Sequence, residues 1–129
     1  MDSKYILGID ELDSQHEEIE SICIALEGAV EEKDRWRNLL EKLCEKLRFH
    51  FRAEESIMDI FAYPESQKHK RSHLNIINLV ESYKYAAMTD AVIKKLKNQP
   101  MQVILEQILD QDMTFASFFK KNKERLGIQ

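Results

Sequence analysis

The segment from Trp36 to Phe61 repeats apolar residues at the spacing of one face of an α-helix. These residues are Trp36, Leu39, Leu40, Leu43, Leu47, Ile57, Met58 and Phe61. At about 100° per residue, Glu54 falls at the centre of this stripe and His50 lies about 40° from it. A carboxylate and an imidazole are therefore expected in the core. An ionised glutamate there is costly unless a partner holds it, and a single such pair would ordinarily be a core histidine bonded to a glutamate.

Helical periodicity extends through almost the whole chain, which predicts an all-α fold. The 129 residues include only 3 Gly and 2 Pro, which leaves few turn residues. The expected long helices run over about 14–33, 35–62, 67–87 and 100–125, with a short helix near 91–97. A single kinked helix would also fit the segment that follows residue 88. We predict an up-down-up-down four-helix bundle with a short N-terminal arm, 1–12, in one domain over 1–129.

Charge and composition argue against several classes of protein. The formal net charge is −4, and the 33% of charged residues are of mixed sign without a basic stripe. Nucleic-acid binding is therefore not expected. No apolar run approaches the length of a membrane span, and the N-terminus lacks a signal-peptide pattern. Cys23 and Cys44 lie far apart beside apolar stripes, so we expect buried free thiols, with one disulfide as the alternative. These features predict a soluble, cytoplasmic protein without membrane contact.

All four histidines of the chain fall on inward faces of the predicted helices. They are His16, His50, His69 and His73. The last two are one helical turn apart, so both can bind one metal ion, but no glutamate follows His69 as in the HExxH motif of zinc proteases. Any one histidine would pass as a core residue. Four of them together with Glu54 predict a non-haem metal site with room for two ions, for which iron or manganese is suited and zinc acceptable.

A series of short motifs also runs through the chain in a fixed order. They are Gly8-Ile9-Asp10, Asp13-Ser14-Gln15-His16, His50-Phe51-Arg52-Ala53-Glu54-Glu55 with Met58, Tyr63-Pro64, His69-Lys70-Arg71-Ser72-His73, and Ile108, Asp112, Phe115 and Phe118-Phe119. In these motifs and their spacing the chain resembles the bacteriohemerythrin family of hemerythrin-like domains. The resemblance covers the whole chain. It implies a four-helix bundle that holds two iron ions as an oxo- or hydroxo-bridged pair.

The resemblance also implies a role for each candidate ligand. Glu54 and Asp112 would be carboxylates that bridge the two irons. His16 and His50 would bind the iron that takes oxygen. Spacing alone does not choose Asp112 over Asp110 in the last helix, and only the resemblance makes that choice.

The chain departs from the family at one position. His69 and His73 would bind the second iron with a third histidine, which the family places five residues before the bridging aspartate. That position is Gln107, whose amide oxygen is a weaker donor than an imidazole. Gln107 and Asp112 would diverge by about 140° on an ideal helix, although a local wide turn would bring them together. The second iron would bind Gln107, bind water, or stay five-coordinate.

Glu20 is a further candidate, because it lies about one turn from His16. It would add a carboxylate to the site or hydrogen-bond a bound ligand; the alternative is an edge residue that faces water.

Dioxygen binding for carriage, storage or sensing is the function that the resemblance implies, with O2 as the small partner molecule. The alternative is a di-iron enzyme that turns over peroxide, nitric oxide or O2 at a site opened by Gln107. A third hypothesis is a site that binds one ion or another metal and serves structure.

Overall fold

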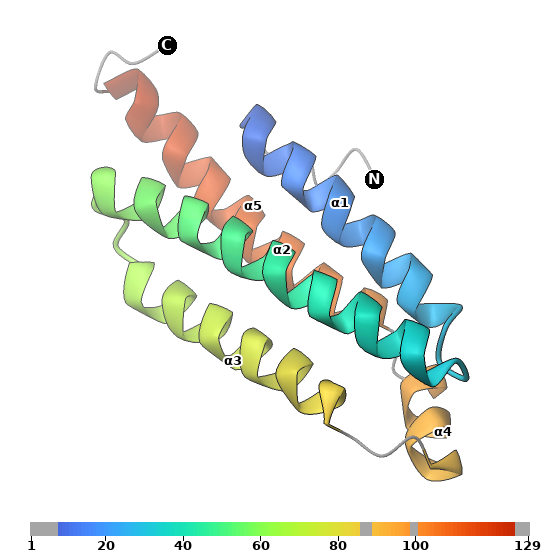
Figure 1. Cartoon of the computed structure of the whole chain (residues 1–129). Helices are drawn as coiled ribbons and strands as arrows, with labels where there is room; N and C mark the ends of the chain where they lie inside the picture. The colour runs from blue at the N-terminus through green and yellow to red at the C-terminus, as the bar shows by residue number, and fades with distance from the viewer. Residues whose placement is uncertain (1–7, 86–88, 99–100, 126–129) are drawn as a thin grey trace.

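The computed structural model describes residues 8–85, 89–98 and 101–125. Within these ranges every regular element is a helix, which confirms the predicted all-α class. The elements are α1 (Asp10–Glu27), α2 (Lys33–Ile60), α3 (Ser66–Lys84), α4 (Asp90–Asn98) and α5 (Met101–Arg125). The four long helices lie alongside one another as a helical bundle, and the short α4 lies at one end (Figure 1).

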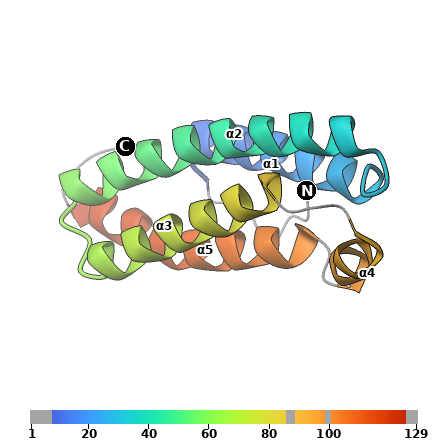
Figure 2. The ribbon, with the colours of Figure 1, turned by 60° about the horizontal axis from the view of Figure 1, so that its bottom comes forward.

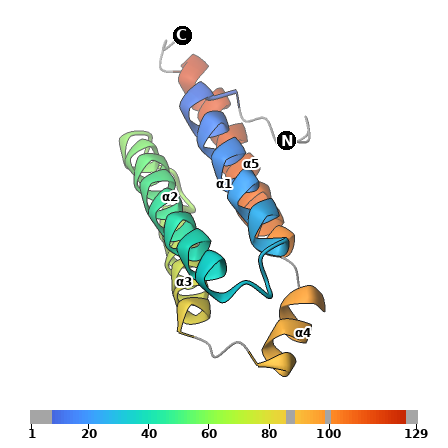
Figure 3. The same cartoon turned by 45° about the vertical axis from the view of Figure 1, so that its right-hand side comes forward.

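The packing of the long helices is uneven. Close contacts join α1 with α2, α2 with α3, and α1 with α5. Figure 3 shows α2 and α3 on one side of the bundle and α1 and α5 on the other. On the remaining side α3 faces α5 (Figure 2), and this pair is not among the closely packed ones.

The first helix begins earlier than predicted. Asp13 lies inside the first turn of α1, where its Oδ2 accepts a hydrogen bond from the Gly8 backbone N–H at 3.1 Å. Gly8 has a φ of 83°, which glycine adopts without strain. Acidic side chains in the first turn also favour the positive end of the helix dipole. Residues 10–12 of the expected arm are thus helical, and residues 1–7 lie outside the described part of the chain.

The first helix also ends earlier than predicted, at Glu27 instead of Lys33. Gly28 follows it and begins the turn that leads to α2. Val30 fits the apolar stripe and is buried, but it is buried from this turn and not from a helix. A buried apolar residue at helical spacing therefore does not show that the helix continues to that residue.

The remaining boundaries lie within a few residues of those predicted. α3 begins at Ser66, one residue before the expected start at residue 67. Thr89 caps α4, because its Oγ1 accepts a hydrogen bond from the Val92 backbone N–H at 3.3 Å. Between the expected helices 91–97 and 100–125, residues 99 and 100 lie outside the described part of the chain.

The buried apolar side chains form one large cluster and two small ones. The large cluster contains residues of all four long helices, among them Leu26, Trp36, Leu40, Val80 and Leu105. The small clusters are built around Leu12 with Ala116, and around Met58, Tyr63 and Phe115.

The polar residues of interest lie between these clusters. On α1, His16 follows Leu12 of a small cluster and precedes Ile19 of the large one.

Cys23 and Cys44 are buried free thiols, as expected, so the alternative of a disulfide is wrong. No helix in the described ranges combines the length and apolar character that a membrane span needs.

Candidate metal centre

Six ionisable side chains from α1, α2, α3 and α5 converge between the apolar clusters. They are His16, His50, Glu54, His69, His73 and Asp112. His69 and His73 are 6% and 3% exposed, and the other four have no exposed surface. The six form two groups that share Asp112, and within each group the candidate ligand atoms lie within 4.8 Å of one another.

The first group joins two histidines to one carboxylate oxygen. Nε2 of His16 and Nε2 of His50 lie 2.7 and 2.8 Å from Oδ2 of Asp112. The same two nitrogens are 3.0 Å apart. Two ligands that bind one metal ion at right angles are separated by about 3.0 Å when each bond is about 2.1 Å long. The three atoms therefore have the spacing of neighbouring ligands on one ion.

The second group is centred on Glu54. Its Oε1 lies 2.7 Å from Nε2 of His69 and 3.0 Å from Nε2 of His73. Its Oε2 lies 3.7 Å from Nε2 of His50, which belongs to the first group. Asp112 reaches back in the same way, with Oδ1 3.1 Å from Nε2 of His69. Each carboxylate thus lies between the two pairs of histidines.

Two of the imidazoles are held through their outer nitrogens by polar residues that are not candidate metal ligands. Nδ1 of His50 lies 2.7 Å from Oε1 of Gln15, and Nδ1 of His73 lies 2.8 Å from Oε2 of Glu55. Because each outer nitrogen donates its hydrogen, the Nε2 lone pair faces the site. Phe51 also stacks on the His73 ring, with the ring centroids 3.8 Å apart.

Burial and the neighbouring charges set opposite pKa shifts on the two carboxyl groups. Burial and the charge of Asp112 raise the pKa of Glu54 well above its usual value. Burial opposes ionisation of Asp112 as well, but its close contacts with the imidazoles of His16, His50 and His69 outweigh burial and lower the pKa of Asp112 well below the usual value. The pair therefore tends to hold one negative charge, on Asp112.

The two histidines of α3 are also shifted in opposite directions. Burial and the neighbouring His69 lower the pKa of His73 to about 3, so this ring is neutral and offers its lone pair at pH 7. Burial acts against a charge on His69, but Asp112 and Glu54 outweigh it and raise the pKa of His69 to about 9. In the metal-free protein His69 thus carries a positive charge that balances the negative charge of Asp112.

Unpartnered atoms at the centre of the cluster test whether a metal fits. Both oxygens of Glu54 and Nε2 of His73 are buried without an aligned hydrogen-bond partner, although imidazole nitrogens lie close to Glu54. A buried carboxylate without a donor is costly, and a cation would satisfy it. Imidazole and carboxylate together suit iron, manganese and zinc. The residues present therefore fit a metal centre.

The structure separates two other candidates from this cluster. Gln107 was expected to face inward, but it is exposed and lines a surface pocket with Ser72 and Asn75. α5 is α-helical throughout its described length, without the wide turn that would bring Gln107 beside Asp112. Neither group of ligand atoms includes Glu20, which is half-buried.

Asp110, which spacing could not distinguish from Asp112, is exposed. Gln15 and Glu55 went unassigned because their histidine partners lie on neighbouring helices. In the sequence, Gln15 and Glu55 are marked only as polar residues next to the candidate ligands His16 and Glu54.

Comparison with known proteins relates this chain to one family. A family model described as "Hemerythrin HHE cation binding domain" matches residues 7–113, a range that contains all six clustered residues. A bacteriohemerythrin of Clostridium acetobutylicum is 26% identical over 121 residues, which cover 87% of this chain and 94% of that protein. No solved structure gives a significant match.

Proposed function

We propose a function from the premise that this chain belongs to the family of hemerythrin HHE cation-binding domains. The buried cluster holds two iron ions and binds dioxygen, for carriage, storage or sensing. One observation carries this proposal: Glu54 and Asp112 each lie within 4 Å of imidazole nitrogens from both histidine pairs. An up-down-up-down course of the four long helices belongs to the same proposal, because it brings these residues to one level of the bundle.

The protein contributes ligands, orientation and a dry environment. His16 and His50 would hold one ion, His69 and His73 the other, and Glu54 and Asp112 would bridge them. Reduced iron bound there would supply the electrons for reversible dioxygen binding. Gln15 and Glu55 fix the rings that they contact. The apolar clusters on either side exclude water, which favours release of the bound gas over irreversible oxidation.

Metal analysis and absorption spectra test the proposal. Protein loaded with ferrous iron without oxygen should contain two irons per chain, and air should produce an absorption band that disappears when oxygen is removed. Asp112→Asn should lower the iron count, because Asp112 contacts both histidine pairs. Asp110→Asn is the matched control, since Asp110 is exposed one half-turn away. Fewer than two irons in the unaltered protein, or a band that never reverses, would contradict the proposal.

The exposed position of Gln107 favours a second candidate function. Without a third imidazole near His69 and His73, that ion would keep a position for an exchangeable ligand, as an enzyme of peroxide, nitric oxide or O2 would need. Steady-state turnover of one of these by the iron-loaded protein, lost in Glu54→Ala, would support it. Gln107→His should leave metal retention unchanged if the side chain stays exposed; increased retention would show that position 107 reaches the metal.

A further inference from the structure

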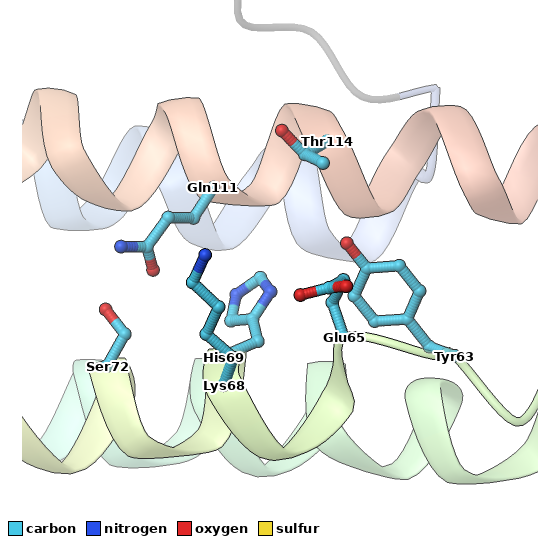
Figure 4. Close-up of a pocket in the computed structure, with 7 residues that line it drawn as sticks. All are labelled: Tyr63, Glu65, Lys68, His69, Ser72, Gln111 and Thr114. Carbon is cyan, nitrogen blue, oxygen red and sulfur yellow. The ribbon is translucent and has the colours of Figure 1, made fainter.

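A pocket of about 210 Å³ lies between α3 and α5, on the side where these helices are not closely packed. Figure 4 shows His69 rising from α3 into this pocket, with Gln111 reaching toward it from α5. Ser72 and Thr114 line the pocket on either side of them. His69 is also the most exposed of the six clustered side chains, at 6%. The pocket therefore joins the surface to one member of the cluster.

The opposite side of the cluster is closed in comparison. His16 and His50 have no exposed surface. A smaller cavity of about 90 Å³ lies near them between α1 and α2, lined by Gln15, Glu18, Lys46 and Phe49, and none of these is a candidate ligand. The amide of Gln15 stands between that cavity and His50, to which it is bonded.

Gln111 has an unused hydrogen-bonding group in the pocket of about 210 Å³ that His69 also lines. Its Oε1 is buried and has no hydrogen-bond partner. An amide can turn about its last bond, so that it presents either an acceptor or a donor. Buried polar atoms are nearly always paired, so a molecule in this pocket would complete the site.

We infer that a small inorganic ligand reaches the metal pair through the pocket between α3 and α5 and binds on the His69 side, hydrogen-bonded to Gln111. This rests on the proposed function and adds to it which ion takes the ligand. The family resemblance implies the iron held by His16 and His50. In the structure, however, His16 and His50 have no exposed surface, whereas His69 lines an accessible pocket. The ion on the His69 side is also the one for which this chain lacks the third histidine of the family.

Azide binding to the oxidised, iron-loaded protein tests the route, with rapid-mixing absorbance as the measurement. Thr114→Trp places a large side chain at the exposed rim of the pocket and should slow azide association about tenfold or more. Lys68→Trp narrows the same pocket from α3, and it provides a second test of the route in case Thr114→Trp does not fold. Glu18→Trp, at the smaller cavity, is the matched control and should leave the rate unchanged.

The role of Gln111 is tested by equilibrium titration. Gln111→Leu should weaken azide binding about fivefold, the loss expected for one hydrogen bond, with two irons per chain retained. If azide association is slower in Glu18→Trp but not in Thr114→Trp or Lys68→Trp, the proposed route is wrong. If Gln111→Leu binds azide with unchanged affinity, the proposed hydrogen bond to Gln111 is wrong. Either of these results would leave the proposed function unaffected. Fewer than two irons per chain in the unaltered protein would contradict both the proposed function and this inference.

Discussion

His50 and His73 are held through their outer ring nitrogens by groups of different charge. A neutral amide, that of Gln15, contacts His50, and a carboxylate, that of Glu55, contacts His73. A carboxylate partner makes an imidazole more basic and a better metal ligand. The ion beside His73 should therefore be held more strongly through its imidazole than the ion beside His50.

Glu55→Gln tests this difference, because it preserves the length of the side chain and removes its charge. Metal affinity should fall about tenfold, measured by competition with a chelator. Gln15→Glu is the converse variant, since it places a carboxylate beside His50 and should raise the affinity of the other ion. Equal affinities in all three proteins would show that the outer partners orient the rings without changing their basicity.

Glu54 predicts a pH dependence of the metal-free protein. Its pKa is raised in the folded state by burial and by Asp112, so the unfolded chain loses this proton first as the pH rises. The group therefore destabilises the fold increasingly above its unfolded pKa and has no effect below it. Glu54→Gln should raise the free energy of unfolding by about 1–3 kcal/mol near pH 8 and leave it almost unchanged near pH 4. Urea unfolding at both pH values measures this, and an equal gain at both would exclude the charge as its cause.

At the scale of elements, the two glycines that flank α1 differ in what they require. Gly8 has a φ of 83°, and an added Cβ would lie 3.1 Å from Cε of Lys120. Gly28 has a φ of −80°, and its added Cβ would meet only Ala25 O, at an ordinary 3.7 Å. Only the first position needs glycine for its backbone.

Gly8→Ala should therefore lower the free energy of unfolding by about 1–2 kcal/mol, the cost of a left-handed residue with a Cβ. Gly28→Ala should raise it by about 0.4–1 kcal/mol, since it reduces the freedom of the unfolded chain without strain. Thermal unfolding of the two variants under identical conditions compares them. A similar loss in both would mean that α1 does not depend on the conformation of Gly8.

The helices could be predicted from the sequence, but the width of their inward faces could not. Helical spacing predicts α5 and puts Gln107 on the same face as Ile104 and Ile108, but the structure exposes Gln107. Periodicity fixes the centre of a stripe, whereas the packing of the neighbouring helix decides which edge residues are covered. His16 and Glu54 lay at or near stripe centres and are fully buried. The contact of Gln15 with His50 could not be foreseen, because it depends on how α1 and α2 align.

At the scale of the whole molecule, the candidate ligands tie all four long helices to one point. An ion bound there stabilises the folded state over the unfolded chain, in which the ligands are dispersed. Removal of metal should therefore lower the melting temperature and increase amide hydrogen exchange on every long helix. Loss of protection on one helix alone would contradict this.

Leu43→Ala supplies the control for that experiment. Leu43 is buried in the large apolar cluster, away from the polar residues. The variant should lose about 2–5 kcal/mol of unfolding free energy, with and without metal. Its metal count should stay at that of the unaltered protein, which separates the contribution of the core from that of the ions.

The contact between His16 and Asp112 joins residues 96 positions apart in the chain. Contacts between such distant residues form slowly, because the intervening chain must lose its freedom before they are made. The helix that carries Asp112, α5, is also synthesised after the other three long helices of the bundle. The centre is complete only when α1 and α5 have come together, so an ion that needs both His16 and Asp112 gains its full set of ligands after that contact forms.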